Sequence, residues 1–402
     1  PAVSGVGYFC DTSGGAFTVT LPLSPAAGAV IGVSDYANNF ATNNLTLGRN
    51  GSNIGGVAAD SVLVVNGAAV TLVYVDATKG WIVTDSGLQS DASEAILYVT
   101  ATGGTITCSG DYRIHTFTGP GTLCVSCAGN ASGSTTVDYL VVAGGGAGGG
   151  GNPSGYGRGG GGAGGYRESP GTASGSYSVS PLGVAPAAAL PVSVTGYPIT
   201  VGAGAATNSP TPTGANGDSG TPSTALGITS AGGGGGGLTQ GVNGGSGGGG
   251  GDGCNTNEIG GTGNTPPVSP SQGFPGGLNF PCRAGGGGGG ATAAGLGPTA
   301  PHGGGPGGNG ATTSISASPT TYSGGGGGGG NQPFGPTRGL GGTGGGGNGG
   351  GYFVPGGQLA TAGTTNRGGG GGGGGYNACV SSNSTGAAGG SGIVVIRYKF
   401  QN

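Results

Sequence analysis

"TYSGGGGGGGNQPFGPTRGL", residues 321–340, contains an unbroken run of glycines from Gly324 to Gly330. A single run of this kind is typical of a flexible linker. Here similar runs recur between residues 144 and 392, separated by short segments of mixed composition. The fold therefore depends on whether the runs are independent tethers or parts of one ordered structure.

The composition argues against a disordered chain. The sequence has 402 residues, of which 113 are glycine and 25 are proline. Disordered segments normally combine high charge with few apolar residues, whereas this chain is only 6% charged and 33% hydrophobic. Its backbone groups therefore need partners other than water.

Polyproline II geometry supplies such partners. Ordering a residue costs roughly 1–2 kcal/mol of backbone entropy, and the loss is largest for glycine. A polyproline II helix has no internal hydrogen bonds, so its amides and carbonyls all point toward its neighbours. Only glycine lets such helices approach closely on every side. Tracts of about six to eight residues would form rods of about 20–25 Å.

The sequence thus predicts a packed polyglycine II bundle over residues 144–392. A collagen helix is excluded because no G-X-Y period is kept. Silk-like stacked strands and slack linkers remain weaker alternatives. The small interruptions of the tracts, among them Ala147, Ala163, Ser246, Asn309 and Thr343, are expected on the outer layer. The residues chosen to represent the tracts are Gly232, Gly247, Gly287, Gly327, Gly345 and Gly371.

The rest of the sequence predicts β-structure, with essentially no α-helix. Residues 1–88 hold short runs rich in Val, Thr and aromatics between turn residues, typical of a β module. Within them, residues 66–85 predict a hairpin anchored by Trp81. Residues 89–143 predict a β platform, completed by a strand at 393–400 because both segments run into glycine tracts. A further β excursion is expected at 176–230. The predicted fold class is therefore all-β plus a polyglycine II helix bundle.

Several function classes are disfavoured by what the sequence lacks. The formal net charge is −3 and only Lys79 and Lys399 are lysines, so a nucleic-acid partner is not expected. The apolar runs are far shorter than the ~20 residues of a membrane span. No phosphate-binding loop or acid–base pair is evident, so we expect no enzyme, no cofactor and no metal site. The start at Pro1 and the lack of methionine suggest a processed product or a fragment.

Seven cysteines leave at least one unpaired within the chain. Cys124 and Cys127 form a C-x2-C, but nothing completes a zinc set. Cys254 and Cys282 close a long loop, and a disulfide between them would add roughly 3 kcal/mol. Such a bond would indicate an extracellular or virion setting.

The segments between tracts carry residue types favoured at recognition surfaces. Loops on a rigid scaffold are where binding residues concentrate. The alternative is that these side chains only cap the bundle. The candidate receptor-binding residues are Phe274, Phe280, Phe334, Arg338, Tyr352, Phe353, Tyr376 and Asn377.

Two sets of motifs resemble a known family. "VDYLVVAGGGAGGGG" (137–151), "GYPITVGAGA" (196–205) and "GGSGIVVIRY" (389–398) resemble the glycine-rich domain at the ends of bacteriophage tail fibres. "YFCDTSGGAFTVTLPLSP" (8–25) resembles a β module that precedes it in marine phage fibres. Together the motifs span nearly the whole chain.

The resemblance implies a non-enzymatic receptor-binding adhesin on the virion, in which a polyglycine II brick displays loops at its distal end. Its partners would be a bacterial surface protein or glycan, other fibre or virion proteins, and two further copies in a homotrimer. The cysteines are more numerous than such fibres lead one to expect, so a self-assembling extracellular filament protein remains the alternative. Ice binding is a third, weaker reading because no regular Thr or Ala face is evident. The distal loops would be 252–284, 291–302, 311–323, 331–340, 352–367 and 376–388.

Overall fold

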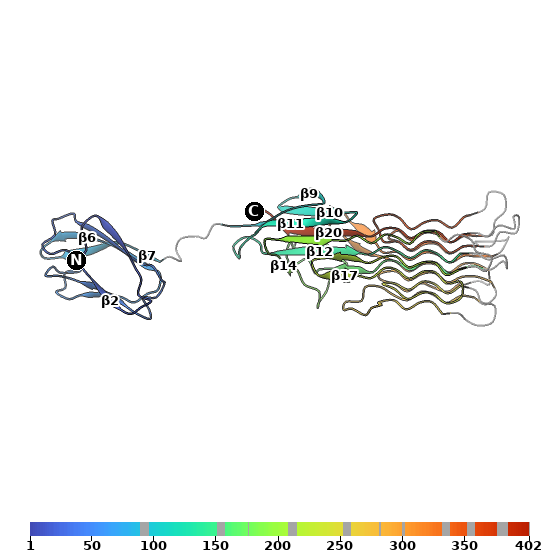
Figure 1. Ribbon diagram of the computed structural model, residues 1–402, viewed down its shortest axis with the longest axis horizontal. Helices are drawn as coiled ribbons and strands as arrows, with labels where there is room; N and C mark the ends of the chain where they lie inside the picture. Colours follow the sequence, from blue (N-terminus) through green and yellow to red (C-terminus); the bar gives the residue numbers. More distant parts are fainter. Residues whose placement is uncertain are drawn as a thin grey trace. The chain divides into compact units, whose positions relative to one another are not determined.

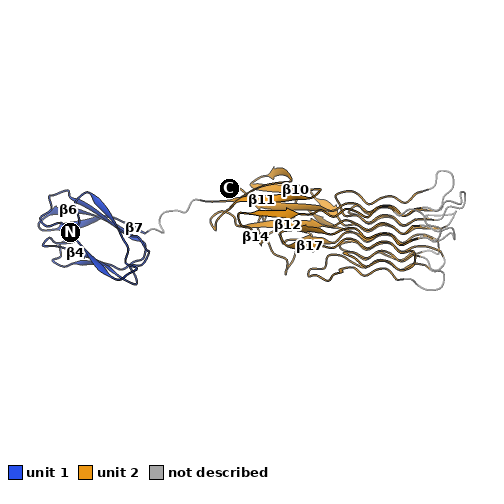
Figure 2. Ribbon diagram, viewed as in Figure 1, with its two compact units in different colours: residues 1–95 blue, residues 96–402 orange. Residues whose placement is uncertain are grey.

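A computed structural model describes most of the chain. The described residues are 1–88, 96–150, 157–175, 177–207, 215–251, 259–280, 283–299, 302–331, 338–351, 358–375 and 385–401. The chain divides into two compact units, Pro1–Ala95 and Ile96–Asn402, each with a core of its own (Figure 2). All regular elements of the described residues are β-strands, which confirms the all-β prediction with essentially no α-helix (Figure 1).

The first unit consists of two small sheets that share one core. The strand orders are β1-β3-β6-β7 and β2-β4-β5. Side chains from both sheets fill the core, among them Ile31, Leu45 and Leu72, each 0% exposed. The strands are β1 (Val6–Cys10), β2 (Phe17–Thr20), β3 (Val30–Asp35), β4 (Leu45–Gly48), β5 (Ser61–Leu63), β6 (Ala68–Asp76) and β7 (Gly80–Leu88).

The β6–β7 hairpin confirms the hairpin predicted over residues 66–85. Tyr74 pairs with Trp81 in the strand register, and their rings meet edge to face at 5.6 Å between centroids. Trp81 is fully buried, as expected of the anchor. Gly80 precedes it with a φ of +68°, and an added Cβ there would lie 1.8 Å from the Asn53 carbonyl oxygen. This turn therefore requires glycine.

The second unit begins with a β platform of two sheets. One has the order β13-β12-β20-β10-β9, with β14 paired to β12, and the other has the order β15-β11-β8. An apolar core lies between the sheets, with Leu123, Val141, Val394 and Tyr398 among its buried members. The strands are β8 (Val99–Thr102), β9 (Thr105–Ser109), β10 (Tyr112–Phe117), β11 (Gly121–Ala128), β12 (Thr136–Val142), β13 (Tyr166–Glu168), β14 (Leu190–Pro191), β15 (Gly196–Ile199) and β20 (Ile393–Lys399).

The strands that border the glycine region are neighbours in this platform. β12 pairs antiparallel with β20, from Val142 opposite Ile393 to Asp138 opposite Arg397. The chain thus leaves the platform at the end of β12 and returns to it at the start of β20. Two short hairpins pack nearby: β16 (Ser223–Ala225) with β17 (Ile228–Ser230), and β18 (Ala311–Thr313) with β19 (Thr320–Tyr322).

A second apolar cluster covers the other face of the larger sheet. Leu140 and Val395 pack there with Ile315 and Tyr322 from the β18–β19 hairpin. A buried carboxylate ties the same region together, since Glu168 accepts hydrogen bonds from the Tyr166 hydroxyl (2.8 Å), the Ser180 amide (3.0 Å) and the Thr313 hydroxyl. Burial raises the pKa of Glu168 above its ordinary value.

Between β12 and β20 the chain runs back and forth as extended glycine rods, which lie side by side and lead away from the platform (Figure 1). We call each pass a rod and name it by its residues. Successive rods alternate in direction because each is followed by a turn or connection at one end. The described rods are 143–150, 157–165, 200–207, 215–222, 231–237, 241–244, 246–251, 259–263, 273–280, 284–290, 295–299, 302–310, 323–331, 338–343, 346–351, 358–364, 368–375 and 385–392.

The 157–165 rod shows how the rods are held together. Its amides donate hydrogen bonds of 2.7 to 3.1 Å with a period of three, so every third residue bonds to the same neighbouring rod. The 368–375 rod accepts the amides of residues 158, 161 and 164, at residues 374, 371 and 368. The 231–237 rod accepts those of residues 159, 162 and 165, at residues 237, 234 and 231. The 284–290 rod accepts those of residues 160 and 163, at residues 286 and 289. Its carbonyls accept from the 143–150, 246–251 and 323–331 rods. Six rods therefore surround it, as expected for hexagonally packed helices with three residues per turn.

The 323–331 rod, which contains the Gly324–Gly330 tract, is surrounded in the same way. Gly327 donates to Gly347 at 2.9 Å, and its carbonyl accepts from Gly373 at 2.9 Å. An added Cβ at Gly327 would lie 2.1 Å from the Gly339 carbonyl oxygen. The tract is thus an ordered interior rod, and a slack linker is excluded for it.

Rods at the margin of the bundle carry proline and larger side chains where a residue faces outward. In the 273–280 rod, Phe274 and Gly277 donate inward to Gly290 and Gly287. Pro275, which has no amide hydrogen, falls between these positions, and Leu278 follows it at the same phase of the period and is 48% exposed. Proline fits because it lacks a donor and its φ suits a polyproline II helix.

Two expectations about the tracts are wrong. Ala147, Ala163 and Ser246 are fully buried rather than on the outer layer, whereas Thr343 is exposed as expected. The interior thus accommodates a small side chain at these three positions, whereas an added Cβ at Gly161 or Gly288 would lie about 2 Å from a carbonyl oxygen. Gly345 belongs to a turn, with a φ of +99°, because the 341–351 tract reverses direction there to form two rods.

Candidate functional site

The candidate functional site is the end of the bundle away from the platform, which we call the far end. The rods that leave the platform reach this end, and the next rod starts from it. The 238–240 turn is a described connection at this end. The carbonyl of Leu238 there accepts a hydrogen bond of 2.9 Å from Nη1 of Arg158, whose side chain is buried at the end of the 157–165 rod. The remaining connections here lie outside the described residues.

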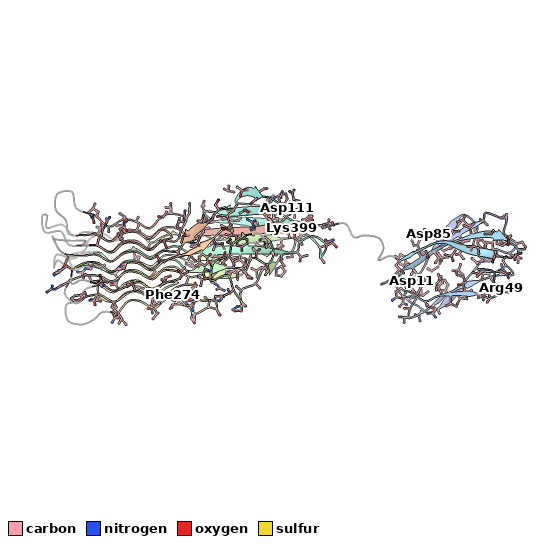
Figure 3. All side chains as sticks on the ribbon, turned by 180° about the vertical axis from the view of Figure 1, so that it is seen from behind. Asp11, Arg49, Asp85, Asp111, Phe274 and Lys399 are labelled. Atoms are coloured by element: carbon pink, nitrogen blue, oxygen red, sulfur yellow. The ribbon has the colours of Figure 1, made fainter. Side chains whose placement is uncertain are left out.

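The predicted contact residues fall in different places. Phe280 ends the 273–280 rod at this far end, and Arg338 begins the 338–343 rod there. Phe274 lies six residues before Phe280, about 19 Å along the rod, on the side of the bundle (Figure 3). Phe334, Tyr352, Phe353, Tyr376 and Asn377 lie outside the described residues, as do Cys254 and Cys282.

One of the expected distal loops is at the opposite end. Residues 311–323 form the β18–β19 hairpin, and Ala311 and Tyr322 are buried against the platform sheet. The apolar character of Ile315 and Tyr322 explains this position, since the hairpin covers a face of β20 that would otherwise be exposed to solvent. Residues 259–263 and 358–364, also expected as loops, are rods.

Three neighbouring rods bring polar side chains together at the far end. Arg283 precedes the 284–290 rod, His302 begins the 302–310 rod and Asn331 ends the 323–331 rod. Arg283 Nη1 donates to His302 Nε2 at 2.7 Å, and His302 Nδ1 lies 2.8 Å from Asn331 Oδ1. A guanidinium can only donate, so Nε2 is the acceptor and the proton of the imidazole is on Nδ1. The Asn331 amide also donates to the His302 carbonyl at 3.1 Å.

Sequence reasoning did not select these three residues. The signal that could have found them is position, because each is a polar residue within two positions of a tract: "RAGGGGGG", "HGGGPGG" and "GGGGGGGN". In a bundle of adjacent rods, residues at tract ends are brought together although they are distant in sequence.

The other histidine has a structural role. His115 is fully buried in β10; its Nδ1 lies 2.7 Å from the Gly103 carbonyl oxygen and its Nε2 lies 2.9 Å from the Tyr398 hydroxyl. The same hydroxyl accepts from the Ala101 amide at 3.1 Å, so the network joins the two platform sheets. Burial is the largest cause that lowers the pKa of His115 below its ordinary value.

The described residues provide neither a metal-binding cluster nor a membrane-spanning helix. Within these ranges no group of three His, Cys, Asp or Glu side chains is placed to hold a metal ion. Nor does that part of the chain contain a helix with the length and apolar character needed to cross a membrane. The described cysteines Cys10, Cys108, Cys124 and Cys127 are free thiols.

Residues 118–399 match the family model of the glycine-rich domain, and the match runs from just before β11 to the end of β20. The chain belongs to this glycine-rich domain family. The match includes most of the platform as well as the rods. A search of curated proteins found no match.

Proposed function

We propose that this glycine-rich domain protein is a phage tail-fibre tip adhesin, which recognises a bacterial surface receptor through the far end of its rod bundle. The observation that carries the proposal is the architecture of the second unit. A lattice of backbone hydrogen bonds brings the ends of many rods together at one end of the bundle. Side chains from distant parts of the sequence, such as Arg283, His302 and Asn331, meet there.

The packing restricts which residues the rods can contain. Interior glycines admit no side chain, because an added Cβ at Gly161 or Gly288 would lie about 2 Å from a carbonyl oxygen. Positions at the rod ends, such as Phe280 and Arg338, carry large side chains. A scaffold of this kind can change its binding residues without changing its core, as a host-recognition protein requires.

The test is binding of the labelled full-length chain to a panel of bacterial strains. A tip adhesin labels some strains and not others, and pre-incubation with it protects labelled strains from a phage that infects them. Equal labelling of all strains, or no labelling of any, contradicts the proposal. The location on a virion and the homotrimer remain predictions; light scattering of the purified chain gives the mass that tests the trimer.

Electron microscopy of the purified chain tests the alternative of a self-assembling filament. An adhesin gives discrete particles at all concentrations. Uniform fibrils with a subunit repeat would instead favour the structural filament.

A further inference from the structure

Arg283 carries a positive charge at the far end of the bundle, and the side chains that hold its guanidinium in place are uncharged. The three rods that carry Arg283, His302 and Asn331 are mutual neighbours: Gly285 donates to Gly329, Gly305 to Gly285, and Gly328 to Gly305 at 2.8 to 3.0 Å. Their rigid spacing sets the positions of the three side chains. The side chain of Arg283 is exposed at the surface.

The charge of Arg283 meets no opposite charge in the described part of the chain. Its side-chain contact there is with His302 Nε2, and the tautomer deduced above makes that imidazole neutral. A guanidinium has five N–H donors in a planar fork, so one bond orients it and leaves other donors directed to solvent. Guanidinium forks match the two oxygens of a carboxylate better than any other side chain does.

An aromatic ring lies on the same turn. The Phe280 carbonyl accepts hydrogen bonds from the amides of Arg283 and Ala284, and the Phe280 amide donates to the Ala284 carbonyl. Phe280 is 37% exposed. A sugar ring packs its apolar C–H face on an aromatic side chain, and an acidic sugar adds a carboxylate within reach of an arginine.

We propose that Arg283, oriented by His302 and Asn331, binds the carboxylate of an acidic polysaccharide. This inference rests on the proposed adhesin function and specifies the receptor class at the same end of the bundle. The protein as a whole has a formal net charge of −3, so general attraction to a polyanion is not expected. Binding to one would therefore report a local site.

The experiment uses the full-length chain and two immobilised polymers, alginate as a polyuronate and dextran as a neutral polysaccharide, at physiological salt. We expect the wild type to bind alginate and not dextran. Arg283→Gln should weaken alginate binding about tenfold or more, since a hydrogen bond to a charged group contributes about 1.5–3 kcal/mol. Arg283→Lys should also weaken it because lysine cannot form the fork. Arg49→Gln in the first unit makes the same change of net charge and should have no effect.

A positioning role for His302 is tested in parallel. His302→Ala keeps the charge of Arg283 but removes its acceptor, so alginate binding should fall several-fold while the unfolding temperature stays near that of the wild type. An Arg283→Gln variant that binds alginate like the wild type, or a wild type that fails to bind alginate or binds dextran equally, overturns the inference. Strain labelling distinguishes failure of this inference from failure of the proposed adhesin function. Selective labelling of strains without alginate binding overturns only the proposal that the receptor is acidic. Alginate binding without labelling of any strain overturns only the proposal that the protein is an adhesin.

Discussion

At the residue scale, the bundle depends on the absence of a Cβ atom. Each interior glycine faces backbone atoms that already hold hydrogen bonds, so these atoms cannot move aside to admit a side chain. The sequence identified the tract residues Gly232, Gly247, Gly287, Gly327 and Gly371 from their runs alone. It could not identify Gly345 as a turn residue, because a reversal within a glycine run has no side-chain signal.

Replacing Gly327 with valine should unfold the bundle. The new Cβ would lie 2.1 Å from the Gly339 carbonyl oxygen, and the cost should exceed the ~1–3 kcal/mol typical of overpacked cores. The measurement is thermal unfolding of the second unit. Gly119→Val is the matched control because an added Cβ there meets no atom within 4 Å. Equal stability of the two variants would contradict close packing around the tract.

Because of His115, the folded platform should lose stability in acid. Its pKa is lowered in the folded state, so below about pH 6.5, the ordinary value for histidine, the unfolded chain binds a proton that the folded chain resists. The stability contributed by neutral His115 is therefore present above that pH and is lost as the pH falls toward the lowered value. His115→Gln should flatten the decline of the unfolding temperature between pH 7 and pH 5. An unchanged pH profile in the variant would rule out this group as the cause.

At the element scale, the sequence predicts which segments form rods but not which rods pack next to each other. Tract length and the three-residue turn predicted rods, and "VDYLVVA" and "IVVIRY" predicted the bordering strands. The order of the rods depends on many turns with no distinctive residues, so it did not follow from the sequence. Because the order of the rods was not predictable, residues 311–323 were expected at the wrong end of the bundle. The apolar residues Ile315 and Tyr322 in this segment did indicate burial.

Proline substitutions along the 273–280 rod should follow its period of three. Leu278→Pro repeats the outward phase of Pro275 and should change stability by less than about 1 kcal/mol, because no inward hydrogen bond is known at that position and the proline φ fits. Gly277→Pro removes the bond to Gly287 and adds ring atoms where a Cβ would lie 2.4 Å from the Leu296 carbonyl carbon. It should cost several times more in chemical denaturation. Similar effects at both positions would argue against the rod geometry.

At the scale of the whole molecule, two separate cores predict two unfolding transitions. The Trp81 core belongs to the first unit, whereas the platform and rods form the second. Calorimetry of the wild type should resolve both transitions, and Gly327→Val should remove only the one that belongs to the second unit. Tryptophan fluorescence assigns the other, since Trp81 is the one tryptophan of the sequence. Loss of both transitions in the variant would contradict independent units.

The central claim is that glycine tracts form an ordered lattice of interior rods, and amide hydrogen exchange tests it most directly. In the intact protein, the amides of residues 157–165 and 324–330 should exchange many orders of magnitude more slowly than an unstructured chain, because their hydrogen bonds open only when the bundle unfolds. In the 273–280 rod, Gly276 and Gly277 should be protected and Leu278 should not. Exchange of the tract amides at the rate of an unstructured chain would contradict the account.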